Sequence, residues 1–246
     1  MDEREKQAEQ GAKGELAEQG AGECVADGAS ECVGDLAIET RQRALTYAFL
    51  SRVLSDDELS ADFFAALRDN PPQTGTELDT FAAGLQGTGD AGLESARTAV
   101  AADHAKCLLG MSALPVSPYE SVWTSPEHLM MQDARKAVVA AYAEAGFAKD
   151  TAFHLPEDHI SIELDFVARL LMRAADKLEA GAAVGAADEK AHGQTELDQA
   201  ARFIGKHLAA WTPLFCEDLE RKASTAFYRG VAQMLRAFVA EENATE

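Results

Sequence analysis

From Leu36 onward, large apolar residues recur every three to four positions, the spacing of one buried face on an α-helix. No run alternates β-branched and polar residues, as a half-buried strand would. The pattern therefore predicts an all-α protein, a single globular domain of roughly eight to ten helices. The expected helical stretches are residues 36–54, 63–67, 78–85, 92–109, 126–146, 156–179, 195–211, a helix from 212, and a last helix over 227–238.

Capping chemistry predicts several of the boundaries. Residues 55–58 (SDDE) have the spacing of a capping box, and Ser125-Pro126-Glu127 combines an N-cap with proline at the first helical position. Thr212-Pro213 predicts a further helix start by the same logic. Residues 180–194, rich in Ala and Gly, are predicted to form a loop. The apolar face expected for the helix over 156–179 consists of Ile160, Leu164, Val167, Leu171 and Leu178.

The first 35 residues differ in composition from the rest of the chain. They are repetitive and rich in Gly, Ala, Glu and Gln, so they offer too little apolar surface to offset the entropy of ordering. We therefore predict a disordered acidic tail over residues 1–35 and one helical domain over residues 36–246. Cys24 and Cys32 fall in this tail, whereas Cys107 and Cys216 fall in apolar helical patterns and are predicted to be core residues.

The charge balance narrows the possible partners. The chain carries 42 acidic and 22 basic residues, a formal net charge of −20. Such a surface repels nucleic acid and anionic lipid and favours a basic partner. No stretch reaches the roughly 18 apolar residues of a transmembrane helix, and the N-terminal sequence lacks the basic and apolar regions of an export signal. These features predict a cytoplasmic protein that binds neither nucleic acid nor membrane.

Motifs for catalysis or metal binding are absent from the sequence. The only E-x-x-H match, Glu189 to His192, lies in the Ala/Gly-rich segment, so a di-iron bundle is not supported. There is no zinc-binding H-E-x-x-H, no phosphate-binding P-loop and no G-x-S-x-G elbow. We expect no catalytic residues, no metal and no cofactor, and hence a protein that is not an enzyme.

Two short clusters suggest a binding site. The first, Pro115–Trp123 (PVSPYESVW), places Tyr, Glu, Ser and Trp in a connection between helices, where binding residues are common. The second, Leu155–Ile160 (LPEDHI), begins a helix and puts His159 four residues before Glu163, on one helical face where the two side chains could hydrogen bond. A purely structural role remains open for both: aromatic residues filling the core, and acids placed at a helix start.

Taken together, these segments resemble the TorD/DmsD family, the NarJ-related cytoplasmic chaperones of molybdenum-enzyme maturation. The resemblance covers about residues 37–240 and keeps the family's motif order. One departure is Leu109, which stands where the family usually has Phe, and the tail has no counterpart. The matching segments are RQRALTYAFLSRVL (41–54), ADHAKCLLG (102–110), PVSPYESVW (115–123), PEDHISIELDF (156–166) and FIGKHLAAWTPLF (203–215).

The resemblance implies a function as well as a fold. Family members bind the twin-arginine leader peptide, the apo form, or both, of a molybdopterin oxidoreductase, assist cofactor insertion and hold back export, in the context of anaerobic respiration. Here it implies a monomer or a domain-swapped homodimer. The peptide-binding residues it implies are Tyr119, Glu120, Ser121, Trp123, Pro156, Asp158, His159 and Glu163.

Other readings remain open at this stage. One is a structural adaptor that binds the folded partner enzyme without recognising a leader. Another is a nucleotide-binding enzyme, against which the missing P-loop argues. The ordinary pKa of histidine, near 6.5, also predicts that His159 makes peptide binding pH-sensitive.

Overall fold

The computed structural model describes residues 33–150, 154–184 and 187–244, and within these ranges the protein is all-α, as predicted. The only extended pairing there is one isolated bridge. None of the helices in the described ranges combines the length and the apolar content needed to cross a membrane. The elements are a helical stretch over 33–53, α2 (Ala61–Asp69), α3 (Glu77–Leu85), α4 (Asp90–Cys107), α5 (Glu120–Thr124), α6 (Asp133–Glu144), α7 (Ile160–Val184), α8 (Ala187–Phe203), the π-helix η1 (Ile204–Leu208), α9 (Ala209–Lys222) and α10 (Ala226–Ala244).

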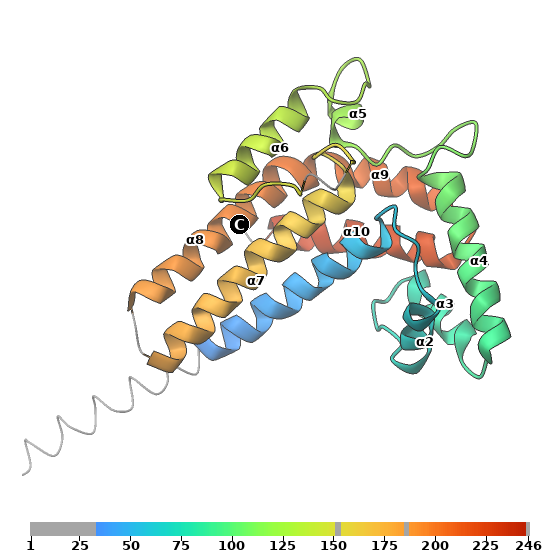
Figure 1. Ribbon diagram of the computed structural model, residues 1–246, viewed down its shortest axis with the longest axis horizontal. Helices are drawn as coiled ribbons and strands as arrows, with labels where there is room; N and C mark the ends of the chain where they lie inside the picture. The colour runs from blue at the N-terminus through green and yellow to red at the C-terminus, as the bar shows by residue number, and fades with distance from the viewer. Residues whose placement is uncertain (1–32, 151–153, 185–186, 245–246) are drawn as a thin grey trace, which may run out of the picture.

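The long helix α7 forms the centre of one half of the molecule (Figure 1). Helix α8 packs along it, and the stretch over 33–53 runs beside it in the opposite direction. Two contacts fix that direction: the Ser51 hydroxyl donates to the Ser161 carbonyl at 2.7 Å, and Arg41 pairs with Asp176 at 3.0 Å. Helices α2, α3 and α4 lie at the other end, where α3 packs on α10 and α2 packs on α3 and α4.

The apolar faces predicted from the periodicity form a common core. Ile160, Leu164, Val167, Leu171 and Leu178 are all buried, as are Cys107 and Cys216, which confirms their prediction as core residues. At the α2–α3 end, four phenylalanines stack edge to face around α10, which joins the two halves of the molecule. These phenylalanines are Phe63, Phe64, Phe81 and Phe227.

Two predicted helix starts are wrong. The N-cap of α2 is Ser60, whose hydroxyl accepts the Phe63 N–H, whereas the Ser55 hydroxyl donates back to the Arg52 carbonyl. After Ser125 the chain makes only a turn, and α6 begins eight residues later at Asp133. The turn does not continue because His128 adopts a left-handed φ of 52°, with its ring Nδ1 2.8 Å from the Val122 carbonyl.

Two predicted interruptions are also wrong. The loop expected over 180–194 is largely helical, because Ala is a strong helix former and Gly193 allows α8 to pack closely against Leu178 of α7. Thr212-Pro213 starts no helix. Both residues lie inside α9, where the burial of Trp211 and its neighbours outweighs the cost of a helical proline, about 3 kcal/mol.

The predicted tail can be compared with the structure only at its end. Residues 33–35 belong to the helical stretch, so the predicted boundary lies three residues too late. The rest of the tail, with Cys24 and Cys32, lies outside the described residues.

The crossing of α3 and α10 depends on Gly230. A Cβ built at this position would lie 2.0 Å from the backbone nitrogen of Leu78, which is a steric overlap with main chain rather than with a movable side chain. The two helices therefore approach as closely as they do only because residue 230 is glycine.

We predict that Gly230→Ala lowers the free energy of unfolding by about 2–3 kcal/mol, because the two helices must separate to admit the methyl group. Urea denaturation monitored by circular dichroism measures this. The matched control is Gly84→Ala in α3, where a Cβ meets nothing within 4 Å, and where alanine raises stability by up to about 1 kcal/mol. Equal effects of the two substitutions would contradict the close-packing argument.

Candidate functional site

The two clusters singled out in the sequence lie side by side in the structure. Residues 118–120 and 158–160 pair through backbone hydrogen bonds: the Glu120 N–H donates to the Asp158 carbonyl at 3.0 Å, and the Ile160 N–H donates to the Pro118 carbonyl at 2.8 Å. Tyr119 and His159 form the single antiparallel bridge between them. This pairing joins the short helix α5 to the start of α7.

Asp158 is fully buried and holds α5 through its carboxylate. The Ser121 backbone N–H donates to Asp158 Oδ2 at 3.1 Å, and the Ser121 hydroxyl donates to the same oxygen. Ser121 Oγ in turn accepts the Gln132 N–H at 3.2 Å, at the end of the loop that follows α5. One buried carboxylate therefore positions both α5 and that loop.

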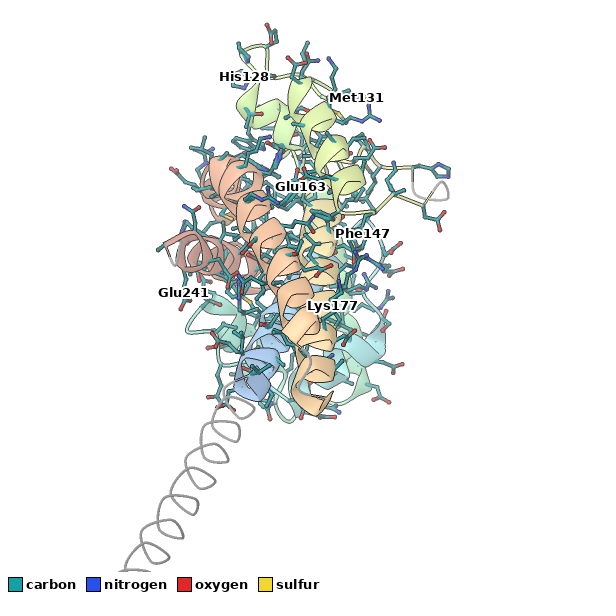
Figure 2. All side chains as sticks on the ribbon, turned by 90° about the vertical axis from the view of Figure 1, so that its left-hand side faces the viewer. His128, Met131, Phe147, Glu163, Lys177 and Glu241 are labelled. Carbon is teal, nitrogen blue, oxygen red and sulfur yellow. The ribbon has the colours of Figure 1, made fainter. Side chains whose placement is uncertain are left out.

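A second buried set connects α5 with the π-helix and α7 with α9. Glu120 and His207 are both buried, and Glu120 Oε2 lies 3.0 Å from His207 Nδ1, which donates because a carboxylate only accepts. The Trp211 indole N–H donates to Glu163 Oε2 at 3.3 Å. Burial, reinforced by the negative charge of Glu120, raises the pKa of Glu163 well above its ordinary value. Figure 2 shows Glu163 in the interior, between the long helices.

His159 is buried and bonded locally. Its Nδ1 lies 2.8 Å from Ser161 Oγ and accepts the Ser161 N–H at 3.2 Å, while its ring packs edge-on against Tyr119 at 5.1 Å. The predicted hydrogen bond to Glu163 is therefore wrong. Burial, with a contribution from His104, lowers the pKa of His159 to about 3. The predicted pH sensitivity near neutrality is wrong for the same reason, since this ring stays uncharged there.

The eight predicted site residues thus fall into two groups. Three are partly exposed: Tyr119, Trp123 and Pro156. The Trp123 indole N–H donates to the Ser117 carbonyl at 2.7 Å, which ties α5 to the preceding segment. The other five are buried and in this structure contact only other parts of the chain: Glu120, Ser121, Asp158, His159 and Glu163.

Sequence reasoning missed three members of this network. His207 and Trp211 lie in the segment over 203–215 that carries the family resemblance, so a signal was present, but no role was assigned to them. Ser161 gave no signal, because its partner is the neighbouring His159 and the sequence does not show which way that ring turns.

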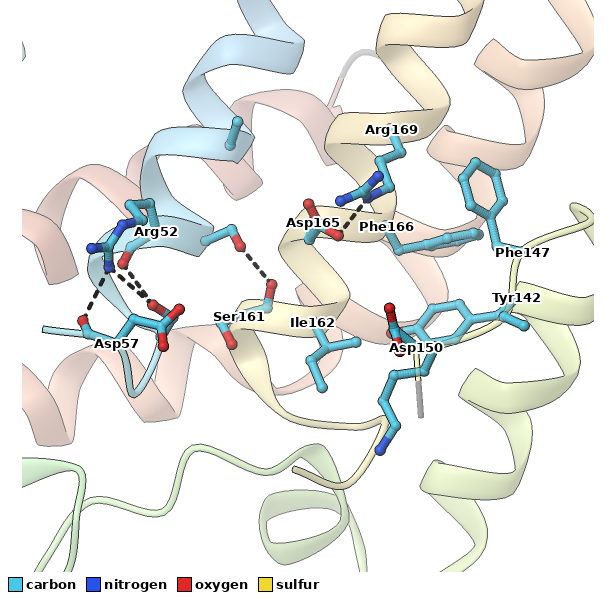
Figure 3. Close-up of a pocket in the computed structure, with 15 residues that line it drawn as sticks. Arg52, Asp57, Tyr142, Phe147, Asp150, Ser161, Ile162, Asp165, Phe166 and Arg169 are labelled. Carbon is cyan, nitrogen blue, oxygen red and sulfur yellow. Dashed lines mark hydrogen bonds and ion pairs between the residues drawn. The ribbon is translucent and has the colours of Figure 1, made fainter. Parts of the chain in front are cut away.

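A cavity of about 560 Å³ opens beside this network (Figure 3). Its walls are the end of the helical stretch over 33–53, the segment after it, residues 147–150, and the first turns of α7. Ser161, the partner of His159, lines it. The other lining residues are Ala48, Ser51, Arg52, Ser55, Asp57, Tyr142, Phe147, Ala148, Lys149, Asp150, Ile162, Asp165, Phe166 and Arg169.

The cavity combines an apolar wall with charged groups at its edge. Ile162, Phe166 and Phe147 supply apolar and aromatic surface. Asp165 accepts from Arg169 at 2.6 Å, an ion pair in which both side chains remain about half exposed and which is therefore weak and exchangeable. The lining carries Arg52, Lys149 and Arg169 as well as three acids, so a ligand with apolar side chains and charged groups fits these features, and the volume is typical of ligand sites.

Comparison with known proteins agrees with the motifs. The family model described as nitrate reductase delta subunit matches residues 68–217, which is more than half of the chain. The chain belongs to the nitrate reductase delta subunit family. The resemblance to TorD-related maturation proteins that the motifs indicated is thereby confirmed.

Curated relatives of this family member carry a chaperone name. Proteins named "Chaperone protein TorD" are 28% identical over 154 residues in Vibrio parahaemolyticus and 29% identical over 158 residues in Vibrio cholerae El Tor Inaba. The matches cover 63% and 64% of this chain, and 65% and 64% of the relatives. The chain thus spans slightly less than two thirds of the length of the relatives it matches.

We predict that Glu163→Gln changes how stability depends on pH. In the unfolded chain this carboxyl ionises above about pH 4.5, whereas in the folded protein its pKa is raised, so folding takes up a proton at higher pH. The wild-type free energy of unfolding therefore falls as pH rises above about 4.5. Relative to wild type, the variant should therefore gain stability between pH 5 and pH 8, because it lacks the carboxyl whose pKa burial raises.

Urea titrations of both proteins at pH 5 and pH 8 measure this difference. Glu127→Gln, at an exposed position, is the control and should follow the wild type at both pH values. If Glu163→Gln also follows the wild type, the carboxyl is ionised in the folded protein and the argument about its burial fails.

Proposed function

We propose that this protein is a system-specific chaperone rather than an enzyme. It binds the twin-arginine leader, the apo form, or both, of a molybdopterin oxidoreductase, assists cofactor insertion, and delays export until the enzyme is mature. Membership of the nitrate reductase delta subunit family and the name "Chaperone protein TorD" of its relatives support this proposal.

The cavity beside α7 is the observation that carries the leader-binding part of the proposal. A twin-arginine leader presents two guanidinium groups followed by a weakly apolar stretch. Asp57 and Asp165 at the cavity edge match the guanidinium groups, because carboxylates accept charge-assisted, often bidentate, bonds from arginine. Ile162 and Phe166 match the apolar stretch. The net charge of −20 favours such a basic peptide over an acidic one.

The buried residues of the predicted site contribute indirectly in this proposal. Asp158 and His159 hold the start of α7, and Ser161 connects His159 to the cavity wall. Tyr119, Trp123 and Pro156 are partly exposed but do not line the cavity, so they contact the peptide only where it extends beyond the cavity. The predicted set thus divides into positioning residues and contact residues.

The expected affinity is moderate. Burial of about 400 Å² of apolar surface favours binding by about 10 kcal/mol before costs, at about 25 cal/mol per Å². Ordering the peptide and the loss of translational freedom offset most of this gain. A dissociation constant of about 1 μM or somewhat lower follows, which corresponds to about −8 kcal/mol and permits release without ATP.

We predict that the double substitution Asp57→Asn with Asp165→Asn weakens leader binding at least tenfold, because it removes both carboxylates from the cavity edge. Isothermal titration calorimetry with a leader peptide from a molybdopterin oxidoreductase of the same genome measures this. Wild-type affinity should also fall as salt concentration rises, because screening weakens exposed ion pairs.

The matched control is Asp62→Asn with Asp198→Asn, two exposed acids outside the cavity whose loss changes the net charge by the same amount. Its affinity should stay within twofold of wild type. Equal losses in both double variants would mean that only the overall charge matters. If the wild-type protein ignores the leader but binds the folded enzyme, the protein is an adaptor and the leader proposal is wrong.

A further inference from the structure

The loop between α5 and α6 exposes three large apolar side chains in succession. Leu129, Met130 and Met131 are 56%, 42% and 55% exposed. Figure 2 shows His128 and Met131 at one extremity of the molecule, well away from Phe147 of the cavity. A run of three exposed apolar residues lowers solubility and adds nothing to the hydrophobic core. Such a run is therefore expected where it serves binding.

The backbone of this loop is held in an unfavourable conformation. His128 and Met131 have φ angles of 52° and 62°, and in the described ranges they are the only residues other than glycine with positive φ. For a bulky residue such as methionine this conformation is a clear outlier, and it costs about 1–3 kcal/mol per residue. Without contacts that hold it, the loop would relax.

Several hydrogen bonds hold the loop in place, and three of them connect it to α5 and its C-terminal end. His128 Nδ1 lies 2.8 Å from the Val122 carbonyl, the Leu129 N–H donates to Ser125 Oγ at 3.3 Å, and the Gln132 N–H donates to Ser121 Oγ at 3.2 Å. The last of these leads directly to the buried Asp158 carboxylate through the Ser121 hydroxyl. Asp158 is thus connected to the apolar loop by two successive hydrogen bonds.

We propose that Leu129, Met130 and Met131 form a docking surface for an apolar, incompletely folded segment of the client enzyme outside its leader. Asp158 positions this surface through Ser121. The inference rests on the proposed chaperone function and adds a second contact, separate from the cavity assigned to the leader.

The size and charge of the loop favour this occupant over two others. Three half-exposed side chains offer at most a few hundred Å², whereas a stable dimer buries about 800 Å² on each partner, so the loop is too small to hold a second copy of the chain. Anionic lipid is disfavoured because the flanking residues Glu127 and Asp133 are exposed acids on a protein of net charge −20.

The residue types point to a partner of variable sequence. Two of the three side chains are methionine, whose unbranched and polarisable side chain adapts to differently shaped apolar partners. Such adaptability suits an unfolded segment, which presents no fixed surface. A unique folded partner would instead favour rigid aromatic side chains at the contact.

The test uses the triple substitution Leu129→Ser, Met130→Ser and Met131→Ser in the full-length chain. The control is Ile38→Ser with Leu45→Ser, two side chains on the stretch over 33–53 that are each 56% exposed. The probe is a cofactor-free oxidoreductase subunit from the same genome, made without its leader and immobilised for biolayer interferometry. A synthetic leader peptide is titrated separately.

We expect the triple variant to bind the leaderless subunit at least tenfold more weakly, while its leader affinity and melting temperature stay at wild-type values. The control should bind both probes as wild type does. Unchanged binding of the leaderless subunit by the triple variant, or no binding by wild type, would overturn the inference while leaving leader binding intact. Failure of the wild type to bind the leader peptide would instead overturn the leader-binding part of the proposed function.

Two other outcomes would assign the loop to a different occupant and overturn the inference. One is a wild-type dimer in sedimentation that the triple variant does not form. The other is binding of wild type, but not of the variant, to phosphatidylglycerol vesicles.

The positioning role of Asp158 is tested through Ser121→Ala, which removes the hydroxyl between Asp158 and the loop. We expect chymotrypsin to cleave at Leu129–Met131 several times faster than in wild type, because the strained loop is released. The control Ser60→Ala removes a comparable hydrogen bond, the N-cap of α2, and should not change that rate. Equal rates for both variants would exclude the positioning role.

Discussion

The arrangement of α5 and α7 depends on the burial of the Asp158 carboxylate. A carboxyl group without solvent needs hydrogen-bond partners that are fixed in place, because a buried polar group left unpaired costs free energy. Ser121 supplies two donors from a position 37 residues away in sequence. Those bonds require the pairing of residues 118–120 with 158–160, which in turn sets where α7 begins and where the loop after α5 leaves it. The cavity wall and the exposed apolar loop both follow from this one constraint.

The neighbouring set of Glu120, Glu163 and His207 also contains buried carboxyl groups, but their charges are accommodated in a different way. Two buried carboxyl groups cannot both carry a full charge at short range. His207 faces Glu120, whereas burial and the charge of Glu120 raise the pKa of Glu163, which favours the protonated form of the second carboxyl. The π-helix brings His207 to this position from a segment that the sequence suggested only through a motif. These groups fix how three helices meet, and in this structure they are not exposed to a ligand.

The sequence predicted the helices well and their ends poorly, for physical reasons. The buried face of α7 could be predicted directly, because hydrophobic periodicity is a local property of the sequence. Helix starts are harder to predict, because several nearby residues can serve as the N-cap, and here Ser60 caps α2 rather than Ser55. Packing also overrides local preference, which kept Pro213 inside α9 and residues 187–194 helical. The two motif clusters could be named only as a candidate site. Their burial could not be predicted, because the partners Ser121–Asp158 and Glu120–His207 lie 37 and 87 residues apart. The cavity combines side chains from several segments, two of them stretches that carry the family resemblance, but the sequence does not show that these segments meet.

Asp158 and His159 are adjacent in the chain, yet their side chains support different surfaces. Asp158 is linked by hydrogen bonds through Ser121 to Gln132, at the end of the apolar loop. His159 is within hydrogen-bond distance of Ser161, which lines the cavity. Residues 158–161 therefore contact the supports of both surfaces, so a displacement of this segment would move both. Coupling of this kind is reciprocal. If binding at one surface changes the affinity at the other, binding at the second changes the affinity at the first by the same factor. In the proposed function, this pair is a physical route by which contact with the leader and contact with the unfolded body of the enzyme depend on each other.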